Sequence, residues 1–575
     1  MNSLKHTGIL FLCIILLSGC GGKSKNHSRF SFFSKSELKE HYPDFDEKIL
    51  SDSIRAYFAG TSETDVFYQK NSHVPLWTKD IFDSPELDSL VAYLGRSGNH
   101  GVNPEIFRHS KIKRLVDTIR TGAFSKEMPV LYHHLTRLEQ LATKAFVDYN
   151  TGLRYGFVNP KKEFPDSYYI SVQRPDSNYY AVVFSEMQKD PVHFLKESQP
   201  RDSVYLKLQK ALSIYGGNES MEEIPQKNKA NYKIHDVDKT VFPLIAKRLM
   251  ITGELPEVDH PDSIYSSLTP DLLKAVNLFR RQNSYPEDDA VGEPTINALN
   301  RPMSYYGEKI RANLERLRWK KEKPAGNKFV EVNVAAFMLK AIEPGAKPLL
   351  MNVCVGKAGT NQTPLLESEI YYINLNPDWN VPFSIVEKEI YGLVQKKPDY
   401  LRRHRMKLLD KGGKEVNPEA VDWNTLNPKK FPYRIRQDSG EGNSLGRIKF
   451  MFKNSFAVYL HDTPSKGAFS YRNRAISHGC VRVQKPIDLS FFLLEKKDST
   501  YLDRILISID KTPLSQEGRT LFKKGQLKKL DNVVRLSPKV PVYIDYFTSY
   551  VLPDGMIYFA DDVYGFDKKI MEIIG

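Results

Sequence analysis

Cysteine is scarce in this sequence, with four residues in a chain of 575. Cys13 and Cys20 lie close to the N-terminus, so only Cys354 and Cys480 remain in the body of the chain. A disulfide framework is therefore excluded, apart from one conceivable pair. The apolar, strand-like run Leu349–Gly356 around Cys354 predicts a buried core thiol, which leaves Cys480 as the candidate for chemistry.

Apolar runs of membrane-spanning length are also lacking. The longest, Ile9–Leu17, has about half of the ~20 residues that cross a bilayer, and it is typical of a signal-peptide core. Leu17-Ser-Gly-Cys20 follows it and has the pattern of a lipobox; the alternative is an ordinary secretory signal with a chance cysteine. We expect a lipoprotein signal peptide over 1–19, lipidation of Cys20 and a flexible tether over 20–35. The protein would then be lipid-anchored in the cell envelope and face the periplasm.

Nucleic-acid-binding signatures are a third absence. The formal net charge is +14, yet no helix-turn-helix, zinc-finger or RNA-binding motif accompanies it. We therefore expect no nucleic-acid partner. The charge is spread along the chain, so a solvated basic surface is the simplest interpretation, with attraction to acidic wall polymers or anionic lipids as a consequence.

The first part of the chain is expected to be helical. Apolar residues recur at three- and four-residue spacing in Leu87–Gly95 and Leu135–Phe146, with a turn at His100–Pro104 between them. Neither nucleophiles nor acids are concentrated there. Residues 36–262 are therefore predicted to form a helical scaffold domain.

A small helical unit is expected over 263–305. Thr269–Gln282 has the pattern of a capped amphipathic helix, and a turn at Gly292 precedes a second helix. The pattern Ala-Val-x-x-Phe-Arg-Arg-Gln, followed by Val-Gly-x-x-Thr-Ile-x-Ala-Leu299, resembles the peptidoglycan-binding helical domain. A plain helical hairpin is the alternative.

Strand patterns begin after a basic linking helix, 306–327. Period-two alternation from Phe329 onward predicts a mostly-β catalytic domain over 328–509. A helical, basic insertion over 386–445 interrupts this domain and is expected to act as a lid. Residues 510–575 are predicted to add a C-terminal β-hairpin that turns at Asp554-Gly555. The fold class is thus multidomain α+β.

The densest chemistry lies in Tyr459-Leu-His-Asp-Thr-Pro-Ser465 and Ser477-His-Gly-Cys-Val-Arg-Val483. A thiol needs a nearby base to react at neutral pH, and His461 and His478 are the candidates for Cys480. A zinc site is disfavoured because a histidine and a cysteine 19 positions apart fit no zinc spacing, and no further ligand is evident. A serine hydrolase is disfavoured because no Gly-x-Ser-x-Gly elbow occurs. We expect neither a metal nor a cofactor.

The remaining residues of these two motifs receive supporting roles. The backbone N–H groups of Gly479 and Cys480 could form an oxyanion hole, with glycine chosen because a side chain would obstruct the approach. Ser477 could orient the base, and Tyr459 could line the cleft. Arg482 either binds a substrate carboxylate or forms a stabilising ion pair within the fold.

These motifs resemble those of the L,D-transpeptidases of bacterial cell walls, whose signature is a histidine, a spacer, and Ser-His-Gly-Cys followed by an aliphatic residue and Arg. The resemblance extends to the larger members with a scaffold domain, a peptidoglycan-binding-like domain and a capping insertion. It implies that Cys480 is the nucleophile and His461 the base, and that His478 contributes to the cleft unless it only binds a neighbouring carbonyl. Trp379 matches a Trp-x-Val-Pro-x-Ser-Ile element and forms a cleft wall or simply packs. The chain departs from the family at Thr363-Pro-Leu-Leu366, where an aromatic residue is usual.

The resemblance implies a thioester acyl-enzyme that transfers peptidoglycan stem peptides and cross-links the wall, and it makes the protein a carbapenem target. Stem peptides and the membrane would be its partners, with wall-synthesis proteins as further candidates. Two alternatives stay open: an L,D-carboxypeptidase with water as acceptor, and a non-catalytic wall-binding lipoprotein.

Overall fold

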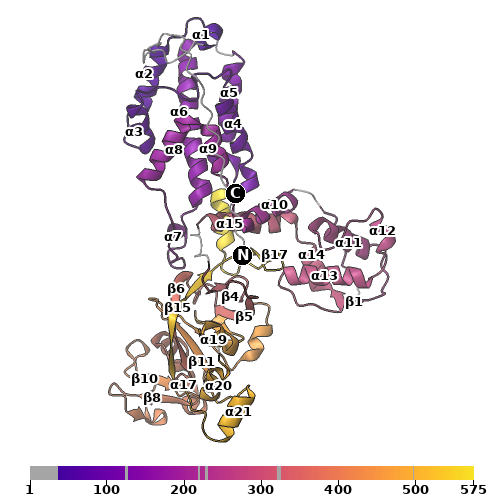
Figure 1. Ribbon diagram of the computed structural model, residues 1–575, viewed down its shortest axis with the longest axis vertical. Coiled ribbons are helices and arrows are strands. Elements are labelled where there is room, and N and C mark those ends of the chain that lie inside the picture. The colour runs from indigo at the N-terminus through magenta and orange to yellow at the C-terminus, as the bar shows by residue number, and fades with distance from the viewer. Residues whose placement is uncertain (1–36, 123–126, 218–220, 227–230, 320–325, 496–497) are drawn as a thin grey trace, which may run out of the picture. The chain divides into compact units, whose positions relative to one another are not determined.

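The computed structural model describes residues 37–575 except 123–126, 218–220, 227–230, 320–325 and 496–497 (Figure 1). The expected signal peptide, Cys20 and the tether lie outside these residues. No helix in the described part is long and apolar enough to cross a membrane. The chain forms two compact units, one built from residues up to 87 together with 114–140, the other from 88–113 and 141–575.

The first unit is helical, and a buried carboxylate holds it together. Glu139 is fully buried and accepts the Tyr68 hydroxyl at 2.6 Å, together with the backbone N–H groups of Leu76, Trp77 and Thr78 at 2.6, 3.1 and 3.1 Å. Burial raises the pKa of this carboxyl. The helices of this unit, of which the last three continue into the second unit, are α1 (Glu37–His41), α2 (Glu47–Tyr57), α3 (Glu63–Lys70), α4 (Pro85–Gly95), α5 (His109–Arg120) and α6 (Met128–Tyr155).

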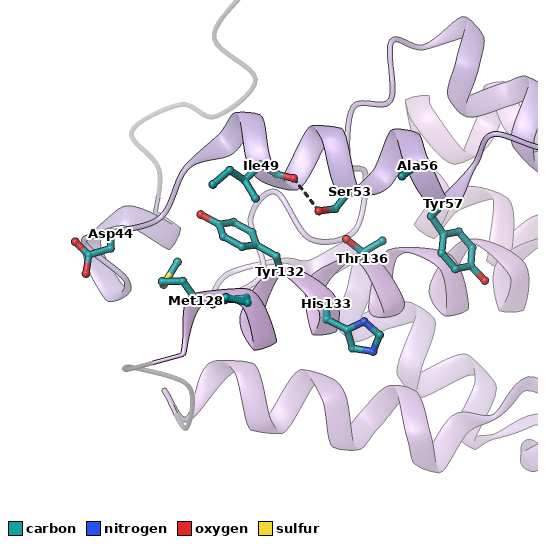
Figure 2. A pocket seen from close by; sticks show the side chains of 10 residues that line it. Asp44, Ile49, Ser53, Ala56, Tyr57, Met128, Tyr132, His133 and Thr136 are labelled. Atoms are coloured by element: carbon teal, nitrogen blue, oxygen red, sulfur yellow. Dashed lines mark hydrogen bonds between the residues drawn. The ribbon is translucent and has the colours of Figure 1, made fainter.

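A groove of about 660 Å³ lies in the first unit, lined by residues of α2 and α6 (Figure 2). Ile49 and Tyr57 on α2 are about half exposed there, and Thr136 on α6 is buried with its hydroxyl unpaired. The groove contains no cysteine and none of the candidate catalytic residues. The residues predicted from the sequence to act in catalysis belong to the second unit.

The second unit begins with more helices, and those expected to form a separate wall-binding-like domain share a core with their neighbours. Val276 and Ile296, from the two predicted helices, pack in one cluster with Leu208, Leu249 and Ile310. The predicted boundaries at 263 and 305 therefore do not enclose a core of their own. The elements are η1 (Ser97–His100), η2 (Pro104–Phe107), α7 (Pro160–Glu163), α8 (Ser177–Lys189), α9 (Pro191–Glu197), α10 (Ser203–Tyr215), β1 (Asn231–Lys233), α11 (Val241–Thr252), α12 (Pro261–Ile264), α13 (Pro270–Gln282), β2 (Ala290–Gly292), α14 (Glu293–Leu299) and α15 (Met303–Trp319).

Helix α15, which covers part of the expected linking helix, is mostly buried. Glu315 is fully buried and accepts the N–H of Val158 at 2.7 Å, the indole N–H of Trp319 at 2.8 Å and the guanidinium of Arg318 at 2.7 Å. A buried carboxylate satisfied by three donors is costly to disturb. Helix α15 is therefore part of the buried interior of the second unit and ties it to the segment around Val158.

The β-rich part is a closed barrel. Its strands follow the order β5-β14-β12-β11-β6-β15-β3-β4, and β4 pairs with β5 to close the ring; β13 adds to β5 at the side. Alternate residues such as Val332, Ile373, Phe450 and Val481 fill the interior, as period-two patterning requires. The strands are β3 (Phe329–Asn333), β4 (Met338–Ile342), β5 (Leu349–Gly356), β6 (Leu366–Leu375), β11 (Ile448–Phe452), β12 (Leu460–His461), β13 (Ala475–Ser477), β14 (Val481–Val483) and β15 (Val533–Asp545).

Strand β15 corrects the predicted end of the catalytic domain. The sequence placed 510–575 in a hairpin extension, yet Val533–Asp545 lies inside the barrel between β6 and β3. Only β16 (Ser549–Val551) and β17 (Ile557–Phe559) form the expected hairpin. The cause is pairing between segments distant in sequence, which local alternation cannot reveal. The accompanying helices are α19 (Pro486–Leu493), α20 (Ser499–Ser508), α21 (Gln516–Lys523) and α22 (Phe566–Ile574).

The insertion is mixed rather than purely helical. A four-stranded sheet, β7-β10-β8-β9, packs with its short helices around a separate apolar core that includes Ile390, Leu408 and Trp423. The chain enters the insertion through β7 and leaves it through β10, and these two strands are neighbours because Asn380 pairs with Arg436. The elements are β7 (Trp379–Asn380), α16 (Phe383–Ile385), the π-helical turn η3 (Val386–Ile390), α17 (Tyr391–Lys396), α18 (Tyr400–Arg403), β8 (Met406–Leu409), β9 (Glu415–Val416), η4 (Pro418–Ala420), η5 (Pro428–Lys430) and β10 (Arg434–Gln437).

Candidate active site

Three basic side chains form a row on the outer face of the barrel. Lys449 on β11 lies opposite His461 on β12, and His461 lies opposite Arg482 on β14. Directly opposed residues share a face of a sheet. The residues beside them, such as Phe450, Leu460 and Val481, point into the barrel. We call Lys449, His461 and Arg482 the basic row.

His461 is held as a neutral base. Its Nδ1 lies 2.5 Å from the backbone oxygen of Asp462, which only accepts, so Nδ1 carries the proton and Nε2 keeps a free lone pair. Burial, and next the positive charge of Arg482, lower the pKa of His461 to about 3. A histidine with this pKa is uncharged at neutral pH and able to accept a proton.

The strand that delivers His461 is short. Strand β12 holds only Leu460 and His461. Asp462 fixes the turn that follows: its carboxylate accepts the N–H groups of Arg447 at 2.8 Å and Thr463 at 2.7 Å. This bracing fixes the carbonyl that holds His461 in one tautomer.

Cys480 lies immediately before β14 and is half-buried, without a disulfide partner. Val481 donates its N–H to the backbone oxygen of Tyr459 at 3.1 Å, so the cysteine and the residues before His461 lie at adjoining strand ends. Burial raises the pKa of the Cys480 thiol, while hydrogen bonds from Tyr459 and the charges of Lys449 and Arg482 lower it. Because burial is the largest of these influences, the resting pair is a thiol with a neutral imidazole rather than a thiolate with an imidazolium.

The turn before the cysteine is fixed by hydroxyl groups. Ser477 donates to the backbone oxygen of Cys480 at 2.6 Å and accepts the N–H of Gly479 at 3.2 Å. Thr363, fully buried, donates to the backbone oxygen of Gly479 at 2.8 Å and accepts the N–H of Gly356 at 2.8 Å. Thus Thr363, part of the segment that departs from the family pattern, supports the cysteine turn.

These contacts correct two expectations. Ser477 was expected to orient the base, but its hydroxyl braces the backbone of the cysteine turn. Gly479 was expected to be required for space, yet a Cβ there would meet only ordinary contacts of 3.8–3.9 Å, and its φ of +113° supplies the actual requirement. Its N–H already bonds Ser477, so this turn must adjust if Gly479 is to donate to an oxyanion.

His478 faces the insertion. Its Nε2 contacts a carboxylate oxygen of Glu389 in the π-helical turn η3. The expected alternative, a hydrogen bond to a neighbouring carbonyl, is not what the structure has. His478 therefore joins the turn before Cys480 to the insertion.

Arg482 has no carboxylate partner within the described part of the chain, and its Nε is buried without a hydrogen bond. The alternative of an ion pair that stabilises the fold is therefore wrong within the described part of the chain.

Trp379 belongs to the strand that leads into the insertion. Burial raises the pKa of Tyr459, and a hydrogen bond from Trp379 lowers it by less. Tyr459 and Trp379 thus lie together beside the thiol.

The sequence analysis did not identify Lys449 as a site residue. Its Nζ lies 3.8 Å from the centre of the Tyr459 ring. Burial lowers the pKa of Lys449, and the negative charge of a Cys480 thiolate raises it. The alternation in Ile448–Phe452 places Lys449 on the outer face, but only the β11–β12 register brings it to the thiol.

Cys354, opposite Arg482 on β5, is fully buried against Ala468 and Phe469, and burial raises its pKa.

Comparison with known proteins shows which domains this chain is similar to. Residues 327–505 match the L,D-transpeptidase catalytic domain and residues 62–212 match the Scaffold domain. A Haemophilus influenzae protein provisionally named an L,D-transpeptidase is 32% identical over 263 residues, which cover 46% of this chain and 49% of that relative. The chain thus spans about half the length of this curated relative. A crystal structure of an L,D-transpeptidase from Xylanimonas cellulosilytica aligns with 56% of this chain and 99% of its own at 12% identity, but its TM-score of 0.16 supports no argument.

Proposed function

Because the chain joins an L,D-transpeptidase catalytic domain to a Scaffold domain, we propose that it cross-links peptidoglycan stem peptides through a thioester on Cys480. The observation that carries the proposal is the pair of adjoining strand ends. Half-buried Cys480 precedes Arg482 by two residues, and Arg482 is the direct cross-strand partner of His461, whose Nδ1–H is held by a carbonyl and whose Nε2 is free.

In the first half-reaction the Cys480 sulfur attacks the carbonyl of a donor stem peptide, and His461 Nε2 takes the thiol proton. Since the pKa values of both groups keep them neutral at rest, proton transfer accompanies attack. The tetrahedral oxyanion is met by the Cys480 N–H and, after the turn adjusts, by that of Gly479. Collapse breaks the peptide bond, and His461 returns the proton to the leaving amine.

In the second half-reaction the amine of another stem peptide attacks the thioester. His461 takes a proton from this amine and gives it to the departing sulfur, which restores the thiol. Arg482, with no carboxylate partner among the described residues, is suited to bind a substrate carboxylate. Water in place of the amine would make the protein an L,D-carboxypeptidase, the alternative that shares the same acyl-enzyme.

The position of the enzyme in the cell forms part of the proposal. The apolar run Ile9–Leu17 and the lipobox ending at Cys20 support a lipid-anchored protein facing the periplasm, where stem peptides occur. Labelling cells with a radioactive fatty acid tests this. Wild-type protein should be labelled and a Cys20→Ala variant should not.

The decisive experiment uses tetrapeptide muropeptides and mass spectrometry. We expect cross-linked dimers from the wild-type protein and from Cys354→Ala, and none from Cys480→Ala. His461→Ala should acylate slower by a factor of about 10²–10⁴. Dimers from Cys480→Ala would refute the nucleophile, and tripeptides without dimers from the wild-type protein would favour the carboxypeptidase. A carbapenem should add once, on the peptide containing Cys480, and an adduct on Cys354 would contradict the assignment.

A further inference from the structure

A second and larger cleft lies away from the thiol. It has a volume of about 900 Å³ and is lined by residues of α6, α8, α9, α10 and α15, of the barrel strands β3 and β4, and of β16. All of these residues belong to the second compact unit. None of the residues named so far around Cys480 contributes to the lining. We call it the scaffold cleft.

The barrel contributes its outer face to the scaffold cleft. Glu331 on β3 and Lys340 on β4 are direct cross-strand partners, and their side chains form an ion pair at 3.5 Å. Their neighbours Val332 and Leu339 point into the barrel. One side of the cleft is therefore a strand surface with paired charges of both signs.

The opposite side is aromatic and basic. Tyr179 and Tyr205 line the cleft, and each carries a guanidinium above its ring: Arg154 at 5.6 Å from Tyr179 and Arg318 at 5.5 Å from Tyr205. Phe194 adds a half-buried ring. Tyr179 and Tyr205 are buried under these guanidinium groups, so Phe194 is the ring left open to a ligand. A ring beside fixed polar groups suits a ligand that has apolar C–H faces as well as hydrogen-bonding groups.

One buried polar group in the lining lacks a partner. The Arg318 side chain is only 1% exposed, and its Nη atoms bond Glu315 and Tyr205, but its Nε bonds nothing. An unmet buried donor is costly, and an ordered water would satisfy it. The lining therefore includes a charged side chain that is itself almost fully buried.

The charge in the lining is nearly balanced. Four basic residues, Arg154, Arg201, Arg318 and Lys340, face three acidic ones, Glu197, Asp202 and Glu331. Arg201 pairs with Glu197 at 2.5 Å. A polyanion such as a phosphate-rich wall polymer or a lipid headgroup surface would require a clear excess of positive charge. The near balance of charge favours a polar ligand that carries little or no net charge.

We propose that the scaffold cleft binds the glycan strand of peptidoglycan, a linear polymer of N-acetylated amino sugars. This rests on the proposed function, which supplies a substrate in which stem peptides are attached to such a strand. Sugar rings offer C–H faces to the half-buried ring of Phe194, and their acetamido and hydroxyl oxygens suit the guanidinium group of Arg154.

The barrel connects this cleft to the thiol. The outer-face residues run from His461 through Arg482 and Cys354 along β5 to Leu350, which lies opposite Lys340. Three strand spacings and four residues along β5 place Lys340 roughly 20 Å from His461. One glycan strand with its attached peptides can therefore occupy both sites, and simultaneous binding raises the effective concentration of the peptide at Cys480.

Binding is tested with the full chain in detergent and chitotetraose, a soluble N-acetylglucosamine tetramer, by calorimetry. We expect saturable binding that Arg154→Ala and Phe194→Ala each weaken about tenfold. The matched control is Arg281→Ala, which removes an exposed arginine of α13 outside the cleft. Absence of binding, or binding that the two lining variants leave unchanged, would overturn the proposal; the latter would place the sugar elsewhere, such as at α13 and α14.

Turnover separates this proposal from the proposed function. Arg154→Ala should cross-link free tetrapeptides at the wild-type rate but glycan-linked chains about tenfold more slowly. Equal losses on both substrates would indicate a structural effect and overturn the cleft assignment. If the wild-type protein cross-links neither substrate while chitotetraose still binds in an Arg154-dependent way, the proposed function fails and the glycan site stands.

Discussion

His461 and Arg482 are direct partners across the parallel pair β12–β14, so a guanidinium lies beside the imidazole proposed as the base. After burial, this charge is the largest cause of the low pKa of His461, about 3. The arrangement keeps the base free of its proton at neutral and mildly acidic pH. A neutral imidazole also cannot stabilise a thiolate as an imidazolium before substrate binds.

Arg482→Gln should shift the acid limb of the pH–rate profile for acylation. The base works only when neutral, so the rate falls as pH drops through its pKa, and loss of the positive charge raises that pKa from about 3 towards 6.5. The variant should therefore lose activity at a higher pH than the wild-type protein. Arg535→Gln, the same change on β15 of the barrel, is the control. Identical profiles for wild type and Arg482→Gln would show that His461 is not the titrating base.

Lys449→Met should slow alkylation of the thiol. The Lys449 charge lowers the pKa of Cys480, so its removal raises that pKa and leaves less thiolate at any given pH below it. Rates with iodoacetamide between pH 6 and 10, measured in a Cys354→Ala background, should move to higher pH, with a several-fold loss near pH 7. A curve that coincides with that of the Cys354→Ala parent would exclude an electrostatic role for this lysine.

Gly446→Ala should destabilise the barrel and impair acylation together. Gly446 has φ +63°, and a Cβ would lie 2.4 Å from a carboxylate oxygen of Asp462, whose backbone oxygen holds His461. We expect a loss of about 2 kcal/mol or more, measured by thermal unfolding, with slower acylation of the folded fraction. Gly442→Ala is a matched control, because its φ is +80° but the space around it is open. Equal effects at the two positions would mean that backbone strain alone matters.

Removing the insertion should separate substrate handling from thiol reactivity. Asn380 and Arg436 are paired, so residues 381–435 can be replaced by a two-residue turn without opening the barrel. The shortened protein should keep an alkylatable Cys480 and lose far more turnover with a large muropeptide than with a small thiol reagent. Similar losses on both would assign the insertion to the barrel's own stability, and unchanged turnover would deny it a role.

Glu389→Gln makes a finer test of the same region. It removes the charge that faces His478 while keeping the size of the side chain. We expect a higher KM for muropeptides with little change in the alkylation rate, because the contact joins the insertion to the turn before Cys480. Glu387→Gln, in the same helical turn, is the control. A loss of thiol reactivity in Glu389→Gln would mean that this contact acts on the nucleophile itself.

The sequence predicted the α+β organisation, because local patterns carry that information. Period-two alternation in Phe329–Asn333 and three- and four-residue spacing in Leu135–Phe146 each correspond to an element of the structure. The sheet of the insertion was missed because its strands, such as Met406–Leu409, are short and lie among helical patterns. Local patterns did not indicate that Val533–Asp545 pairs with Phe329–Asn333.

The candidate site was predictable in its residue types and less so in its contacts. The roles of Cys480 and His461 remain predictions that the motif supports. Lys449 carried no motif signal, since strand register alone brings it to the site. The family pattern around Thr363 did not indicate that its buried hydroxyl bonds the backbone oxygen of Gly479. The contact between Ser477 and the Cys480 backbone oxygen depends on a positive φ at Gly479, which sequence reasoning treated only as open space.

The late strand β15 has a consequence for biogenesis. The barrel begins with β3 at Phe329, but its parallel neighbour arrives only with Val533–Asp545, after both catalytic motifs have been synthesised. Until β15 is made, both motifs lie on an unclosed sheet with free edges on β3 and β6, which are prone to pair with other chains. A nonsense mutation after Ile509 would retain Cys480 and His461 and still leave the barrel open. A chain truncated there should therefore expose unpaired strand edges and aggregate or be degraded.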